Sequence, residues 1–352
     1  MSVSARVPAR VRTTTATGWT AALAALLVVS CAAGVAIGAA DLSIGTVVEA
    51  IAGRLGVGAG TDLLTTHIVM DLRLPRVLAA ALVGAGLALC GAVLQSLTGN
   101  ALADPYLLGM SGGASLGAVL ALTAGVGTAG VLGMSAVSVA AFVAALASLL
   151  VVFLISTSPS GALLPGRLVL AGIAVGQFAA ALTSALVFFG DRDAAHRVLQ
   201  WTLGSFAGAR WSGLVTITAV VAVTTGVLLA HARVLDSFAF GARAAASLGT
   251  DVERSRWVLY GIASLCTAAL VAQSGVIGFV GLVVPHAARM LVGPLHARLL
   301  PVVALAGAVL LVWADIAART VMPGRELPIS IVTAVVGVPV FVLLLRRRGA
   351  RA

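Results

Sequence analysis

Long apolar runs, separated by short polar breaks, recur along this chain from residue 18 to residue 345. A helix needs about 20 apolar residues to cross the hydrocarbon core of a bilayer, and most of the runs approach this length. Only 10% of the 352 residues are charged, against about a quarter in an ordinary soluble domain. Because lipid offers an unpaired backbone no hydrogen-bond partners, the runs predict an all-α polytopic membrane protein and exclude a soluble fold.

The apolar runs predict about ten transmembrane helices. We expect them near residues 18–40, 72–97, 105–125, 131–156, 167–190, 212–232, 256–273, 277–293, 299–320 and 328–345. A short surface helix is expected over residues 44–52, between the first two spans. The helical domain then covers residues 18–348, with a disordered tail rich in Thr and Arg at residues 1–17 and a second tail at residues 349–352.

The distribution of arginine predicts the orientation of the chain. All 22 basic residues are Arg, and placing the N-terminus in the cytoplasm puts thirteen of them inside and eight outside, with Arg289 near an inner helix end. Cytoplasmic loops carry such an excess of positive charge, so both termini are predicted to be cytoplasmic. Topology therefore explains the net charge of +10 better than binding to nucleic acid does. The absence of Lys excludes a P-loop ATPase and Schiff-base chemistry in this chain.

Glycines at four-residue spacing predict close helix contacts. Gly109, Gly113 and Gly117 share one helix face, as do Gly172 and Gly176. Small residues at this spacing let two helix backbones approach each other in a membrane. We interpret these glycines as packing residues rather than as a ligand site.

Few ionisable groups lie inside the predicted spans. Asp315 is the clearest, and Arg319 follows four residues later on the same helix face, so an ion pair near the outer membrane surface is expected. His286 is interpreted as a hydrogen-bonded packing residue, while Gln95, Gln177 and Gln273 could bond between helices or line a pore. The residues form no nucleophile–base pair and no metal-ligand cluster, so the sequence predicts neither an enzyme nor a metal site.

Four stretches of the chain resemble one family of transport proteins. They are RLPRVLAAALVGAGLALCGAVLQSLTGNALADPYLLGMSGGASLGA at 73–118, WTLGSFAGARW at 201–211, GVIGFVGLVVPHAARMLVG at 275–293 and ADIAARTVMPGRELPISIVTAVVGVPVFVLLL at 314–345. The stretches are similar to permease subunits of the FecCD type, which belong to ABC importers for iron-siderophores, haem and vitamin B12. The resemblance covers nearly everything from about residue 67 to the C-terminus.

The resemblance implies an assembly around this chain. A ten-helix protomer would pair with a second permease copy or a paralogue in the bacterial cytoplasmic membrane. Two ATP-binding subunits, which hold ATP and Mg²⁺, would drive it, so no cofactor is expected in this chain itself. A soluble or lipid-anchored binding protein would deliver the cargo, for which a ferric siderophore is our expectation, with haem and vitamin B12 as alternatives.

The resemblance also implies two sets of contact residues. The cytoplasmic loop at residues 233–255, called the coupling loop below, would dock on the ATPase. Its matching and neighbouring residues are Gly241, Arg243, Ala245, Ser247, Leu248, Gly249, Asp251, Glu253 and Arg254, although members of the family often carry an acid near the position of Arg243. Independently of the resemblance, Gly249 is predicted to end a helix.

At the outer helix ends, the resemblance implies contacts between Arg73, Arg76 and Arg319 and acidic residues of the binding protein. Such charge-assisted contacts would orient the two proteins as well as attract them. Asp315 competes with the binding protein for Arg319, because the two residues are expected to form an ion pair. From the residues alone, a secondary transporter driven by an ion gradient stays open as an alternative, with Asp315 or His286 as its ionisable group.

Overall fold

Helices form almost the whole structure, a computed structural model that describes residues 13–38, 42–54, 56–57, 61–125, 130–131, 134–190, 192–322 and 324–349. Within these residues, seven helices are long and apolar enough to cross a bilayer. They are α1 (Thr13–Ala36), α4 (Leu74–Thr98), α6 (Ala136–Ser156), α7 (Pro165–Phe189), α9 (Trp211–Ala230), α12 (Val252–Ser274) and α14 (His296–Thr320). Two shorter apolar helices, α5 (Met110–Thr123) and α13 (Val280–Val292), join them, as does α15 (Ile329–Gly349), whose apolar part is the shorter stretch Ile329–Leu343.

The remaining elements are short and lie mostly near the ends of these helices. They are α2 (Ile44–Arg54), α3 (Leu63–His67), the π-helix η1 (Ile68–Arg73), the 3₁₀-helix η2 (Pro105–Leu108), α8 (Arg192–Thr202), α10 (Ala232–Phe238), α11 (Ala242–Ser247) and the strands β1 (Gly130–Val131) and β2 (Met134–Ser135). The two strands form an antiparallel pair in which Gly130 lies opposite Ser135.

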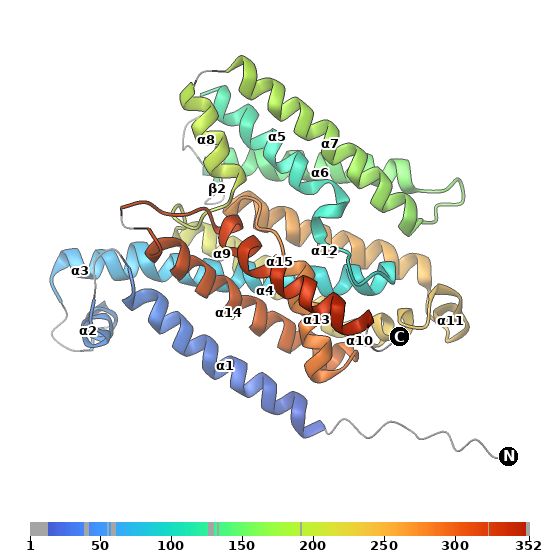
Figure 1. The fold of residues 1–352 in the computed structure, drawn as a ribbon, viewed down its shortest axis with the longest axis horizontal. Coiled ribbons are helices and arrows are strands. Elements are labelled where there is room, and N and C mark those ends of the chain that lie inside the picture. The colour runs from blue at the N-terminus through green and yellow to red at the C-terminus, as the bar shows by residue number, and fades with distance from the viewer. Residues whose placement is uncertain are drawn as a thin grey trace.

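The long helices run between two ends of the molecule (Figure 1). One end, on the left of Figure 1, carries α2, α3 and α8, and we call it the α2 end. The opposite end carries α10, α11 and the end of α15, and we call it the α11 end. Helices α5 to α8 form a layer above the rest of the bundle in this view, while α4 runs through its middle.

Glycine contacts place α4 at the centre of the bundle. A Cβ atom on Gly84 would lie 2.2 Å from the carbonyl oxygen of Gly307 in α14, and one on Gly91 would lie 1.9 Å from that of Gly281 in α13. Only glycine permits backbones to approach this closely. Gln95 reinforces the α4–α13 contact, because its amide donates to the carbonyls of Gly281 (3.2 Å) and Leu282 (3.1 Å).

Pro285 explains why a backbone carbonyl of α13 needs a hydrogen-bond donor from another helix. Proline has no N–H group, so the carbonyl of Gly281, four residues earlier, loses its partner within the helix. The amide of Gln95 supplies that partner, and its Oε1 atom accepts a hydrogen bond from Arg289, which also donates to the carbonyl of Ala92 (3.1 Å). Gln95 therefore bonds between helices, which was one of its two predicted roles.

The predicted spans agree with the observed helices except at some boundaries. The surface helix expected over residues 44–52 is α2, Ile44–Arg54. Helix α1 begins at Thr13, inside the predicted disordered tail of residues 1–17, so the tail prediction is wrong for residues 13–17, and residues 1–12 lie outside the described part of the chain. Gly349 still belongs to α15, and the rest of the second tail, residues 350–352, also lies outside it.

Helix α13 begins at Val280, later than predicted, and the chain from Gly275 to Phe279 before it is not helical. Its buried backbone is satisfied from elsewhere, as it must be in an apolar setting. The Tyr106 hydroxyl donates to the carbonyl of Ile277 (3.0 Å) and accepts from its N–H group (3.1 Å). Gly275 has a φ of 71°, and a Cβ atom there would lie 2.2 Å from the carbonyl oxygen of Trp201.

Candidate functional site: coupling loop, arginine cluster and polar hollow

Two glycines shape the coupling loop at the α11 end. Gly241 (φ 88°) precedes α11, and Gly249 (φ 84°) follows it. The N–H groups of Gly249 and Thr250 donate to the carbonyls of Ala246 and Ala245, both at 3.0 Å. These two bonds are the Schellman pattern that ends a helix in a left-handed residue. The predicted helix end at Gly249 is confirmed, and α11 is a separate short helix before α12.

The coupling loop presents two large apolar side chains to its surroundings. Phe240 is 76% exposed and Leu248 is 69% exposed. The side chains of Arg243, Ser247 and Arg254 are exposed as well. Apolar side chains among polar ones at the two ends of a short helix are a suitable surface for docking another protein.

Three other predicted contact residues have roles within the chain. Ala245 is fully buried, so it cannot touch a partner, and its inclusion among the contacts is wrong. Asp251 caps α12 by accepting a hydrogen bond from the N–H group of Arg254 (3.1 Å). Glu253 accepts from the N–H group of Leu163 (3.1 Å) and thereby ties α12 to the loop between α6 and α7. Contacts of Asp251 and Glu253 with another protein stay predictions.

A partly buried link joins the coupling loop to two core helices. Asp236 in α10 accepts from the backbone N–H group of His296 (2.8 Å) and lies 2.7 Å from its Nδ1 atom. The Nε2 atom of the same histidine lies 2.7 Å from the Ser96 hydroxyl in α4. This chain of contacts runs from α10 through the start of α14 to the end of α4. A displacement of α10 would therefore act directly on both helices.

Arg73, Arg76 and Arg319, the arginine cluster, meet at the α2 end where α1 and α14 end and α4 begins. Arg73 donates to the carbonyls of Val35 and Ala36, both at 2.8 Å. Arg319 donates to those of Gly34 (3.0 Å) and Ile37 (3.1 Å). The last carbonyls of a helix lack partners within it and carry partial negative charge. Both arginines therefore cap α1.

Two carboxylates complete the arginine cluster. Asp315, 1% exposed, lies 2.9 Å from Arg76 and 3.1 Å from Arg319. The predicted ion pair of Asp315 and Arg319 is confirmed. Glu326 accepts two hydrogen bonds from the guanidinium of Arg76, at 2.8 and 2.9 Å.

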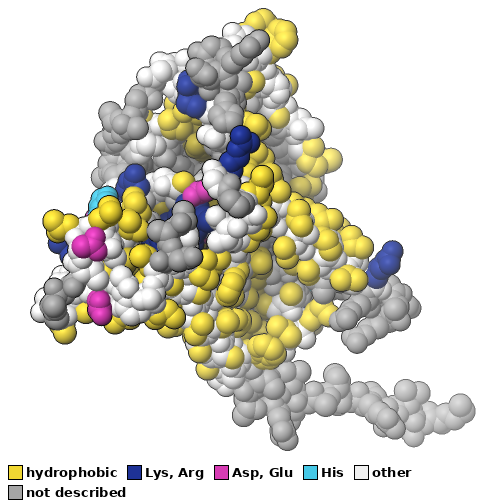
Figure 2. Space-filling view, turned by 60° about the vertical axis from the view of Figure 1, so that its left-hand side comes forward, with side chains coloured by type: hydrophobic (Ala, Val, Ile, Leu, Met, Phe, Trp, Pro, Cys, Tyr) yellow, Lys and Arg dark blue, Asp and Glu magenta, His cyan; other side chains and the backbone are white. Residues whose placement is uncertain are grey.

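The cluster changes the interpretation of its arginines. The side chains of Arg76 and Arg319 are only 11% and 7% exposed, and that of Glu326 is 48% exposed. The three guanidinium groups are bonded within the chain, so they do not project freely toward another protein. A contact with a delivery protein stays a prediction that requires rearrangement of these bonds. Charged side chains gather at the α2 end, while the flank of the molecule is mostly hydrophobic (Figure 2).

A polar hollow of about 490 Å³ lies between the η2–α5 segment and α7. Hydroxyl and amide groups line part of it, among glycines and apolar residues, and its described lining contains no charged residue. The polar lining residues are Tyr106, Ser111, Ser115, Gln177, Thr183, Ser184 and Thr202. Gln177 lines this hollow, and a role for it in lining a pore stays a prediction.

The predicted packing glycines lie beside this hollow. A Cβ atom on Gly172 of α7 would lie 1.9 Å from the carbonyl oxygen of Leu107, and one on Gly109 would lie 2.8 Å from that of Gly172. A Cβ atom on Gly176 would lie 3.6 Å from the Cα atom of Gly109. On the other side of α5, Gly113 and Gly117 face α6, where Cβ atoms would lie 2.7 Å and 2.3 Å from backbone oxygens.

Several of these residues carry no local signal in the sequence. Asp236 and His296 are 60 residues apart, and Arg76 and Glu326 are 250 apart, so no spacing rule pairs them. Within the described residues, no three His, Cys, Asp or Glu side chains lie close enough to hold a metal ion.

Comparison with known proteins identifies the family. The model of the FecCD transport family matches residues 26–347. The chain belongs to the FecCD transport family. This confirms the resemblance inferred from the four sequence stretches, and the chain is an ABC transporter permease of the class that imports vitamin B12, haem or iron-siderophores.

The relatives of this chain include permeases named for different cargoes. It is 41% identical to the cobalamin import permease BtuC of Halobacterium salinarum over 81% of this chain and 75% of that protein. It is 37% identical to the hemin transport permease HmuU of Yersinia pestis, over 81% and 85%, and 38% identical to the ferric enterobactin permease FepD of Escherichia coli, over 92% and 93%. FecCD membership therefore fixes the transport class but leaves the cargo open.

A solved structure has the same fold. It is a protein described as a metal-chelate type ABC transporter in an inward-facing conformation, with a TM-score of 0.81 and 31% sequence identity. The match covers 94% of this chain and 99% of that one.

Proposed function

We propose that this chain is the membrane-spanning permease subunit of an ATP-driven importer whose cargo is a ferric siderophore. The observation that carries the proposal is membership of the FecCD family over residues 26–347. For the cargo, the similarity to the ferric enterobactin permease extends over more of both chains than the similarity to the cobalamin permease does. A hollow without a charged residue in its described lining suits a bulky cargo that passes without a tight site.

In this proposal all ten apolar helices cross the membrane, and both termini are cytoplasmic. The arginine excess supports this orientation, which puts the α11 end in the cytoplasm of a bacterial cell and the α2 end outside. The coupling loop then faces the compartment that holds ATP. The chain itself performs no hydrolysis, because ATP and Mg²⁺ bind to the partner ATPase.

Three kinds of partner complete the importer. A second permease copy or paralogue would close the polar hollow from its open side, where α7 exposes Leu170 (70%) and Phe178 (67%). Two ATP-binding subunits would dock on the coupling loop. A soluble or lipid-anchored binding protein would meet the α2 end, where three arginines face two carboxylates and leave an excess of positive charge.

The geometry suggests how ATP would drive transport. Closure of the ATPase pair would displace α10 and α11, and the Asp236–His296–Ser96 link would pass this displacement to α14 and α4. Two packed arrangements of the bundle would then exchange, as in other interface-driven switches. The hollow would open toward one side of the membrane in each arrangement.

Uptake by whole cells tests the cargo. We expect deletion of this chain to abolish uptake of radioactive iron from one ferric siderophore in a panel, while uptake of haem and cobalamin continues. Restoring the chain should restore that uptake. Loss of cobalamin or haem uptake instead would contradict the siderophore assignment but not the importer, and unchanged uptake of every cargo would contradict both.

A further inference from the structure

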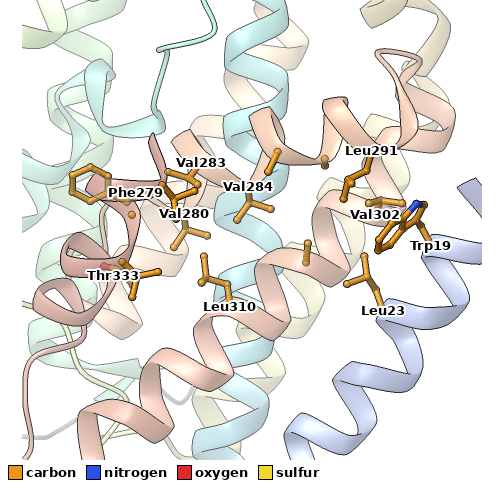
Figure 3. Close-up of a pocket in the computed structure, with 16 residues that line it drawn as sticks. Trp19, Leu23, Phe279, Val280, Val283, Val284, Leu291, Val302, Leu310 and Thr333 are labelled. Atoms are coloured by element: carbon orange, nitrogen blue, oxygen red, sulfur yellow. The ribbon is translucent and has the colours of Figure 1, made fainter. Parts of the chain in front are cut away.

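An apolar groove of about 250 Å³ lies among α1, α13, α14 and α15 (Figure 3). Buried residues of α13 and α14, such as Val284 and Val302, form its floor, and partly exposed residues of α1 and α15 form its two walls. In Figure 3, Phe279 and Thr333 lie at one end of the groove, and Trp19, Leu23 and Leu291 lie at the other. The groove therefore extends along the long helices.

The lining of the groove suits a hydrocarbon chain. None of its described lining residues is charged. Its one hydroxyl, that of Thr333, donates to the carbonyl of Ser330 (3.2 Å) and so offers no free polar group. Such a space does not stabilise a water molecule, because a buried water needs two or more polar hydrogen-bond partners.

Polar donors without a described partner lie at the Trp19 end of the groove. Trp19, 41% exposed, has no hydrogen bond from its indole N–H group to any described residue. Arg298 lies one turn before Val302 on the same face of α14, and side chains in helices lean toward the N-terminus, which here is the α11 end. Its half-buried guanidinium likewise has no partner among the described residues. Arg346, near the end of α15, is exposed at the same end.

We propose that the groove binds one acyl chain of an anionic phospholipid, whose phosphate group lies against Arg298 and Trp19. The apolar length accepts the chain, and the cation and the indole N–H at its mouth match the headgroup. In the proposed orientation, this mouth faces the cytoplasmic leaflet. The inference rests on the membrane location of the chain and not on its cargo or its ATPase, so it can fail without affecting the import function.

Fluorescence quenching tests the lipid site directly. The full-length chain is reconstituted with Trp19 as its only tryptophan, the other four being changed to phenylalanine. Phospholipids with brominated acyl chains quench a tryptophan that they touch. We expect brominated phosphatidylglycerol to bind next to Trp19 about fivefold more tightly than brominated phosphatidylcholine, the preference that one surface cation supplies.

Two substitutions separate the chain site from the headgroup site. Ala306→Phe fills the groove and should reduce both the quenching of Trp19 and the lipid preference. Arg298→Gln should abolish the preference and leave the quenching. Ala22→Phe, on an exposed position of α1 outside the groove, is the matched control and should change neither.

A variant with a different single tryptophan and a second method serve as controls. A variant with only Trp313, which is 45% exposed and lies outside the groove, should show no preference between the lipids. If the tryptophan replacements prevent folding, mass spectrometry of the otherwise unchanged protein should show less bound phosphatidylglycerol after Ala306→Phe. Equal quenching by both lipids, insensitivity to Ala306→Phe, or shielding of Trp19 by another protein chain would overturn the proposal.

Discussion

The Asp315→Ala variant is expected to lose roughly 3–5 kcal/mol of folding free energy, the usual cost of breaking a buried ion pair from one side. Asp315 is 1% exposed and pairs with both Arg76 and Arg319. Its removal leaves two guanidinium groups in the protein interior with less negative charge to balance them. Thermal unfolding in detergent should show a decrease in Tm on the order of 10 °C.

Glu326→Gln is the matched control for this experiment. Glu326 binds the same guanidinium of Arg76, but its side chain is 48% exposed. Water therefore already screens this ion pair and can solvate it when the carboxylate charge is removed. We expect a change below about 1 kcal/mol. An Asp315→Ala variant no less stable than Glu326→Gln would show that the arginine cluster does not hold α1, α4 and α14 together.

The Leu248→Asp variant is expected to fold normally and to lose transport. Leu248 is 69% exposed, so a carboxylate there costs the isolated chain little. In the proposed complex, the same carboxylate would enter an apolar contact with the ATPase. Interface residues of this kind contribute about 2 kcal/mol or more, so binding of the ATPase should weaken roughly thirtyfold. Pull-down of the ATPase and cargo uptake measure the two effects.

Leu295→Asp provides the comparison for Leu248→Asp. Leu295 is 48% exposed at the same end of the molecule, where it precedes α14 and lies outside the coupling loop. An aspartate suits a position before a helix, so both folding and uptake should persist. Equal loss of uptake in the two variants, or full uptake with Leu248→Asp, would contradict docking through the coupling loop.

Local features of the fold followed from the sequence. Apolar run length alone places the long helices, because each run must be helical in lipid. Gly249 ends α11 as its residue type predicts, and Asp315 pairs with Arg319 because the two share a helix face four residues apart. In each case, the interaction lies within a few residues along the chain.

The parts that the sequence did not predict depend on distant segments. Arg76 is 239 residues from Asp315 and 250 from Glu326, so its burial in an ion-pair cluster has no local pattern. The late start of α13 depends on the Tyr106 hydroxyl, which satisfies the backbone of Ile277 from 171 residues away. Ala245 matched the motif of the coupling loop, but its direction depended on how α11 packs.

The energy source of transport is the most direct test of the proposed function. The chain is reconstituted in liposomes with its ATP-binding subunits and its binding protein, and accumulation of radioactive ferric siderophore is measured with and without ATP. We predict that accumulation requires ATP and continues when ionophores remove every ion gradient. Accumulation driven by an ion gradient without ATP would contradict the importer and would favour a secondary transporter.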